Sequence, residues 1–140
     1  MFKCDCTKII VADDNLFNLY SFGIFIEQQG RRLKKVDSGA ALLEELRNST
    51  NCSNTPCSKY LLILADYNME QGLNGVETFR RIRQEKLHLK GSKPSVLIGT
   101  SASEDVRQVF LQQGADDFLL KPFNQPRVKA LFENYLEDRE

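Results

Sequence analysis

The sequence predicts an α/β fold built on a parallel sheet, and two observations lead to this prediction. Short apolar runs rich in Ile, Val and Leu alternate along the chain with segments whose apolar residues recur every three or four positions. Such runs are typical of strands buried on both faces, and the recurrence is typical of amphipathic helices. In addition, three of the runs stop at ionisable residues: residues 8–12 at Asp13-Asp14, 60–65 at Asp66, and 118–120 at Lys121.

Five strands are expected. The runs at residues 8–12 and 60–65 are almost wholly apolar, and the run at 96–98 follows Pro94, which favours a loop before it. Shorter runs at residues 33–36 and 118–120 complete the set.

Five helices are expected, one after each strand. The first can be capped by Asp14 or Asn15 and ends at Gly30. Its apolar residues at helical spacing, expected to face the sheet, are Leu16, Leu19, Tyr20, Phe22, Gly23 and Ile26. The other four helices are expected at residues 40–46, 76–85, 104–113 and 125–136.

Two polar connections separate these elements. Residues 48–59 are rich in Asn, Ser and Thr and predict a mobile surface loop. Residues 87–93 form the second connection, in which His88, the only histidine, is expected to be solvated.

The order of the elements predicts the topology. Alternating strands and helices indicate a parallel sheet with helices on both faces. Right-handed crossovers favour a flavodoxin-like, doubly wound sheet with strand order 2-1-3-4-5 over a barrel, which needs eight such units. With no linker visible, residues 1–140 are expected to form one domain.

Composition excludes several classes of function. The 19 basic and 19 acidic residues balance, so no nucleic-acid or anionic-membrane footprint is indicated. Every apolar run is far shorter than the about 20 residues of a membrane-spanning helix, and no signal peptide is evident, so a cytoplasmic protein is expected. The four cysteines lack zinc-site spacing and are expected to be reduced thiols; they are Cys4, Cys6, Cys52 and Cys57.

The ionisable residues at the strand ends predict a site. Carboxyl ends of parallel strands share one edge of a sheet, where ligands bind, so Asp13, Asp14, Asp66 and Lys121 are expected to converge. Taken singly, Asp13-Asp14 could cap a helix and Asp66 could begin a turn. Three clustered carboxylates repel one another, and a hard divalent cation such as Mg²⁺ removes that conflict.

Such a cluster suits phosphoryl transfer onto a carboxylate. A metal ion and Lys121 can neutralise the transferred group while one aspartate attacks in line. A hydroxyl from the neighbouring strand end, Thr100 or Ser101, could donate a hydrogen bond to a phosphoryl oxygen. The alternatives are a haloacid-dehalogenase-like phosphatase, which would need an aspartate where Asn68 stands, and a binding scaffold without phosphorylation.

Four segments together resemble the receiver domain of two-component response regulators over about residues 7–137. They are Asp13-Asp14-Asn15, Asp66-Tyr67-Asn68-Met69, Thr100-Ser101-Ala102 and Lys121-Pro122-Phe123. The resemblance implies a domain that is not a free-standing enzyme but promotes its own phosphorylation and dephosphorylation. It implies Mg²⁺-dependent transfer from a phosphohistidine donor to Asp66, with Mn²⁺ as a substitute ion.

The resemblance also implies a role for each site residue. Asp14 would bind the metal directly, Asp13 mainly through water, and Asp66 and the main-chain carbonyl of Asn68 would complete the protein ligands. Lys121 would contact the phosphoryl group and precede a cis proline.

By the same likeness, Thr100, with Ser101 as the alternative, is the switch hydroxyl, and Phe118 is the aromatic switch. The face made by the fourth helix, fifth strand and fifth helix would then bind a downstream protein. Asn18 after Asp13-Asp14-Asn15 resembles receivers of hybrid histidine kinases and phosphorelays, so the partner is expected to be a histidine kinase or a histidine phosphotransfer protein.

One segment departs from the family pattern. Glu70 follows Met69 where a proline is usual, and Gly75 lies one residue farther from Asp66 than usual. The loop beside the site is therefore expected to differ from that of other receivers, and Glu70 adds a negative charge to it.

Overall fold

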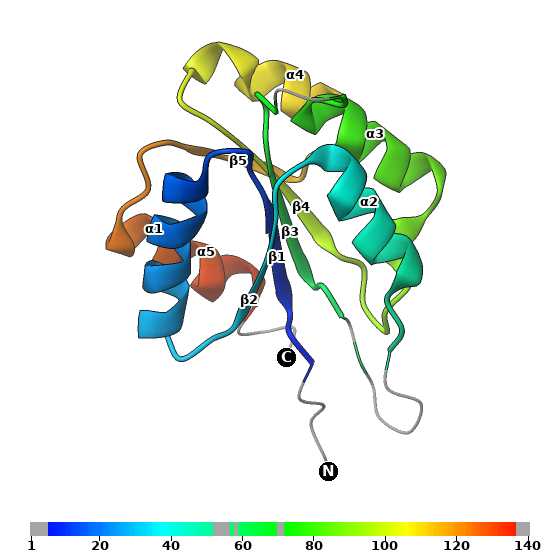
Figure 1. Ribbon diagram of the computed structural model, residues 1–140, viewed down its shortest axis with the longest axis horizontal. Coiled ribbons are helices and arrows are strands. Elements are labelled where there is room, and N and C mark those ends of the chain that lie inside the picture. The colour runs from blue at the N-terminus through cyan, green and yellow to red at the C-terminus, as the bar shows by residue number, and fades with distance from the viewer. Residues whose placement is uncertain (1–5, 52–56, 58, 70–71, 137–140) are drawn as a thin grey trace.

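A five-stranded parallel sheet forms the centre of the computed structural model, which describes residues 6–51, 57, 59–69 and 72–136 (Figure 1). The strand order β2-β1-β3-β4-β5 confirms the predicted topology. The strands are β1 (Ile9–Ala12), β2 (Leu33–Val36), β3 (Leu62–Asp66), β4 (Val96–Ser101) and β5 (Asp117–Leu120).

Helices cover both faces of the sheet, as expected for a doubly wound fold (Figure 1). The helices are α1 (Leu16–Gln28), α2 (Gly39–Asn48), α3 (Gly75–Gln84), α4 (Arg107–Gln112) and α5 (Gln125–Tyr135). Helices α1 and α5 pack on one face and α2, α3 and α4 on the other, each over its own apolar core. Because side chains alternate along a strand, successive strand residues belong to alternate cores.

Short polar residues fix where the helices begin. The side chains of Asn15, Ser38, Asn74 and Asn124 each accept a hydrogen bond from a backbone N–H in the first turn of the following helix. At α3 the cap is reciprocal, because the Glu77 side chain also accepts from the backbone N–H of Asn74. Asn15 therefore caps α1 directly after the Asp13-Asp14 pair.

Strand β4 and the helix after it differ from the sequence-based expectations. Strand β4 runs on to Ser101, because Thr100 and Ser101 continue the parallel ladder beside Asp66 and Leu120. The expected fourth helix begins instead as a 3₁₀ turn, η2 (Glu104–Val106). A second 3₁₀ turn, η1 (Leu87–Leu89), lies in the polar connection at residues 87–93.

His88 is half-buried, so the expectation of a solvated side chain holds only in part. Its Nδ1 atom is buried without a hydrogen-bond partner in the described part of the chain. Burial, followed by the nearby Arg83 charge, lowers the pKa of the imidazole below 6.5. The sequence around His88 is polar and gave no sign of this burial. The neighbouring Leu87 is buried, and it packs the turn against the core.

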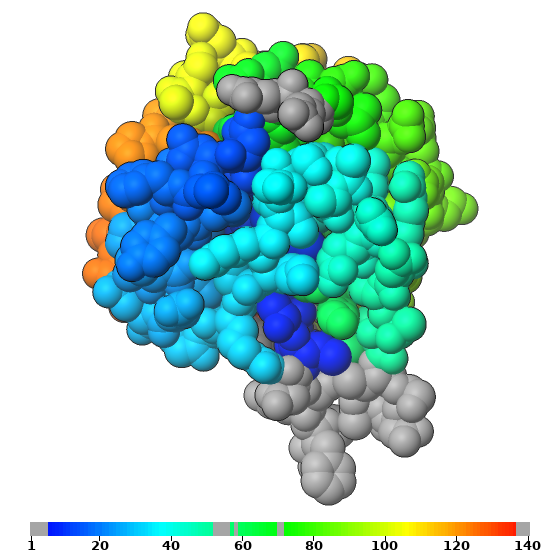
Figure 2. All heavy atoms as spheres, viewed as in Figure 1, coloured from blue at the N-terminus to red at the C-terminus, as the bar shows by residue number. Residues whose placement is uncertain are grey.

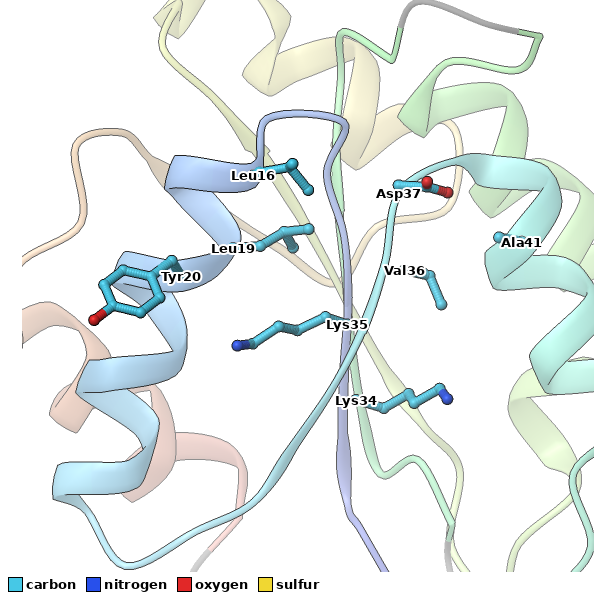
Figure 3. Close-up of a pocket in the computed structure, with 8 residues that line it drawn as sticks. All are labelled: Leu16, Leu19, Tyr20, Lys34, Lys35, Val36, Asp37 and Ala41. Carbon is cyan, nitrogen blue, oxygen red and sulfur yellow. The ribbon is translucent and has the colours of Figure 1, made fainter.

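Helix α1 faces the sheet with only part of its apolar surface. Leu19, Phe22 and Ile26 are buried, whereas the expectation that Leu16 and Tyr20 also face the core is wrong. These two side chains flank an open groove of about 510 Å³ that runs over the edge strand β2 toward α2 (Figure 3). In the space-filling view, the surface of β2 is visible between α1 and α2 (Figure 2).

Among the described residues, no helix is long and apolar enough to cross a membrane.

Candidate functional site

The carboxyl ends of β1, β3 and β5 bring three of the predicted residues into contact. Nζ of Lys121 lies 2.6 Å from Oδ2 of Asp13 and 3.0 Å from Oδ1 of Asp66. The strand register explains the contact: Ala12 pairs with Ala65, so Asp13 and Asp66 follow adjacent positions at the same edge. Both carboxylates are buried.

The alternation of strand side chains places these groups on one face. Asp13, Asp66 and Lys121 each lie two residues beyond a strand residue of the core under α1 and α5. Those preceding residues are Val11, Leu64 and Leu119. The three charges therefore face the same side of the sheet, where α1 begins.

Asp13 is held by contacts from both sides. Its Oδ1 atom accepts a hydrogen bond of 2.9 Å from the backbone N–H of Asn15, and Oδ2 accepts one from Lys121. The cap of α1 and the ion pair thus fix the carboxylate at the turn. Asp66 contacts the same lysine through its Oδ1 atom.

Burial dominates the electrostatics of Asp66. It raises the pKa of the carboxyl from 3.8 to about 6, against the opposing effect of Lys121. The neighbouring Asp13 and Asp14 carboxylates raise it further. Asp66 is therefore ionised at neutral pH at a cost that a nearby cation would reduce.

Three carboxylates in this cluster fit a divalent cation. Asp13, Asp14 and Asp66 each offer an oxygen, and these oxygens lie within 4.8 Å of one another. A donor set made only of hard carboxylate oxygens suits Mg²⁺, which takes its remaining ligands from water or phosphate oxygens. Asn68, whose carbonyl was expected to join them, is exposed just beyond the end of β3.

Two hydroxyl residues end strand β4, and their surroundings differ. Thr100 pairs in register with Asp66, and its carbonyl accepts a 2.8 Å hydrogen bond from the N–H of Tyr67. The carbonyl of Ser101 accepts a 2.8 Å bond from the N–H of Lys121, and its Oγ accepts one of 3.1 Å from Ser103. Both residues are buried.

Phe118 lies inward in β5. Its ring is 5.9 Å from that of Phe110 in α4, and the Arg107 guanidinium lies 4.7 Å from its centroid. Sequence reasoning missed Arg107, because nothing in its spacing shows that it covers an aromatic ring from the next strand. The Arg107 guanidinium therefore covers one face of the Phe118 ring, and the Phe118 side chain is mainly buried.

The loop after Asp66 is only partly described. Glu70 and residue 71 lie outside the described residues, so the predicted effect of Glu70 stays a prediction. Gly75, where α3 begins, is required by close packing. A Cβ there would lie 2.5 Å from the Asp66 carbonyl oxygen and 2.8 Å from the Phe110 ring.

Sequence reasoning also missed an apolar patch beside the site. Leu16 and Phe17 are each 75% exposed and Tyr20 is 63% exposed, on the first turns of α1 directly after Asp14 and Asn15. Exposed aromatic groups beside charged groups are typical of surfaces that bind partners. The signal was present in the sequence, because more apolar residues precede Gly23 than one buried helix face can hold.

Comparison with known proteins gives a consistent result. Residues 9–133 match the family model of the response regulator receiver domain. The chain is 32% identical over 130 residues to the transcriptional regulatory protein CpxR homolog of Haemophilus influenzae, covering 89% of this chain and 50% of that protein. It is 30% identical over 133 residues to the cyclic di-GMP phosphodiesterase response regulator RpfG of Xanthomonas campestris pv. campestris, covering 95% of this chain and 32% of that protein.

Solved structures share the fold. The receiver domain of a sensor histidine kinase from Pseudomonas aeruginosa PAO1, solved with a magnesium ion in its active site cleft, matches with a TM-score of 0.73 at 21% identity, covering 93% of this chain and 97% of that one. The response regulator TrrA of Thermotoga maritima, in complex with Mg²⁺-BeF, matches with a TM-score of 0.73 at 21% identity, covering 91% and 97%. The chain spans half or less of the two curated relatives described above.

Proposed function

This chain belongs to the response regulator receiver domain family, and from that premise we propose that it accepts a phosphoryl group on Asp66 from a phosphohistidine donor. The observation that carries the proposal is the buried cluster in which Lys121 bridges Asp13 and Asp66. We also propose that residues 1–140 form one receiver domain with its core at about residues 7–137, which the family match over residues 9–133 supports.

The chemistry assigns a task to each group. A carboxylate oxygen of Asp66 attacks the phosphorus in line, a P–O bond forms as the P–N bond of the phosphohistidine breaks, and the donor imidazole leaves with the electron pair. Lys121 then turns from the two carboxylates to an oxygen of the phosphoryl group. Asp13, Asp14 and Asp66, with the Asn68 carbonyl, would hold Mg²⁺, which neutralises charge on the transferred group.

Of the two hydroxyls, we propose Thr100 as the switch residue, with Ser101 as the alternative. Strand alternation places Ser101 on the face that Leu97 and Phe118 share, the face under α2, α3 and α4. Thr100 lies on the opposite face, with Ile98. The switch hydroxyl must reach a phosphoryl group on Asp66, and Thr100 pairs in register with Asp66 on the face where the acidic cluster lies.

The exposed patch of α1 supports a route for the donor. A donor protein must bring its phosphohistidine to the carboxyl edge of the sheet, and the apolar side chains of Leu16, Phe17 and Tyr20 stand at that edge. We propose that a histidine kinase or phosphotransfer protein contacts this patch in the cytoplasm. After phosphorylation, the face of α4, β5 and α5 would contact the downstream protein.

A labelling experiment tests the phosphoacceptor role. The protein is incubated with Mg²⁺ and acetyl phosphate, and intact-mass spectrometry measures addition of one phosphoryl group. We expect one group on the wild type, none on Asp66→Asn and none on either protein in excess EDTA. Undiminished labelling of Asp66→Asn would sink the assignment, and a wild type that never labels would favour the scaffold alternative. Sustained hydrolysis of phosphate esters would favour a phosphatase.

A further inference from the structure

Two cysteine side chains lie in contact at the end of the sheet remote from Asp66. The Sγ atoms of Cys6 and Cys57 are 3.5 Å apart, although the residues are 51 positions apart in the sequence. Neither cysteine is in a disulfide; Cys57 is buried and Cys6 is partly exposed. Cys6 precedes β1 and Cys57 precedes β3, so the contact joins the chain segments that enter two adjacent strands.

The backbone on both sides of the thiol pair is held by other contacts. The carbonyl of Lys8, two residues after Cys6, accepts a 3.0 Å hydrogen bond from the N–H of Leu62. The carbonyl of Cys57 accepts bonds from the N–H of Ser92 at 2.9 Å and from its Oγ at 3.0 Å. The sheet and the Ser92 contacts therefore hold the two cysteines together without help from the sulfur atoms.

We propose that Cys6 and Cys57 form a reversible disulfide by exchange with a small-molecule disulfide such as oxidised glutathione. An S–S bond is about 2.05 Å long, so the sulfur atoms must approach by about 1.5 Å, a movement that side-chain rotation can supply. The disulfide then links the segment that enters β1 to the segment that enters β3. Nothing in the phosphoacceptor role requires this pair.

The exchange balances in two steps. The more accessible Cys6 loses a proton, and its thiolate attacks one sulfur of glutathione disulfide, which releases one glutathione thiolate and leaves a mixed disulfide. Cys57 then loses its proton and attacks the Cys6 sulfur, which releases the second glutathione. Two protein thiols are oxidised, and one glutathione disulfide is reduced to two thiols.

The position of the disulfide predicts a selective effect. It closes a long loop of the unfolded chain, so oxidation should raise the melting temperature by about 5 °C or more. It lies at the amino ends of β1 and β3, whereas the acidic cluster lies at their carboxyl ends. Oxidation should therefore leave the rate of phosphorylation by acetyl phosphate within about twofold.

A matched pair of variants tests the proposal. The double variant Cys4→Ser/Cys52→Ser retains only Cys6 and Cys57. The triple variant, which adds Cys6→Ser, retains only the buried Cys57. After equilibration with oxidised glutathione, non-reducing peptide mapping should find the Cys6–Cys57 link in the double variant. Its melting temperature should rise and return on treatment with dithiothreitol, while that of the triple variant should not change.

Three outcomes would overturn the proposal. One is a double variant that carries only glutathione adducts. The second is a wild type whose disulfides join other cysteines in place of this pair. The third is a reduced wild type that retains one zinc ion and resists oxidation while it does so, which would make the cysteines a metal site.

Discussion

Nζ of Lys121 lies 2.6 Å from Oδ2 of Asp13, although 108 positions separate the two residues in the sequence. Because the lysine also lies 3.0 Å from Asp66, one cation compensates two buried carboxylates. It can leave them for a phosphoryl oxygen only if another positive charge takes its place. Under the proposed function, the ion pair therefore links phosphate recognition to cation binding by the acidic cluster.

Lys121→Ala should destabilise the domain and slow its phosphorylation. Removal of the cation leaves Asp13 and Asp66 without compensation, so the free energy of unfolding in EDTA should fall by about 2 kcal/mol. Added Mg²⁺ should restore part of that loss, because it neutralises the same carboxylates. Urea denaturation with and without Mg²⁺ measures both effects. Equal destabilisation in the two buffers would contradict this account.

Asp66→Asn should change how stability depends on pH. Asp66 has a folded-state pKa of about 6 against 3.8 in the unfolded chain, so the folded state binds more protons between these values. The contribution of Asp66 to the free energy of unfolding is therefore lost as pH rises from about 4 to about 6, and it does not return at higher pH. In EDTA at pH 8 the variant should be more stable than the wild type by about 1–3 kcal/mol.

The difference between Asp66→Asn and the wild type should vanish below pH 4, where Asp66 of the wild type is protonated in both the folded and the unfolded chain. Asp105→Asn, at an exposed aspartate, serves as the matched control for the change from Asp to Asn. A variant that is less stable than the wild type at pH 8 would show that the ion pair with Lys121 outweighs burial.

Phe17→Ala should separate donor recognition from chemistry. The side chain is 75% exposed beside the site, so its loss should leave folding and labelling by acetyl phosphate unchanged. Transfer from a phosphorylated histidine phosphotransfer protein should slow about tenfold or more, because a buried aromatic contact is lost. Leu89→Ala, at a 50% exposed position of η1, is the matched control. Equal slowing with both donors would place the defect in the site itself.

Ser101→Ala and Thr100→Val should distinguish the two hydroxyls. With beryllofluoride and Mg²⁺ as the phosphoryl mimic, NMR shifts of the Phe118 ring should change in the wild type and in Ser101→Ala. In Thr100→Val the change should be largely lost, because the hydroxyl in register with Asp66 is missing. The reverse pattern would make Ser101 the switch.

Much of the site follows from the sequence because parallel strands share an edge. The runs that stop at Asp13, Asp66 and Lys121 were sufficient to predict that these residues converge. The order of Thr100 and Ser101 in the sequence could not show which face each one takes. That depends on where β4 ends, and the polar end of the strand gave no signal for it.

Other features depend on contacts that leave no local pattern. Leu16 and Tyr20 have the same spacing as a buried helix face, since a surface that binds a partner obeys the same periodicity. The contact of Cys6 with Cys57 arises only when β1 and β3 pair, and their spacing in the chain carries no trace of it.

Strand β2 has a neighbour on one side only, so the described sheet presents a free backbone edge to solvent. Two exposed lysines, Lys34 and Lys35, stand on this short strand. A second copy that added its own β2 there would bring four like charges together, which opposes stacking into fibrils or edge-linked dimers.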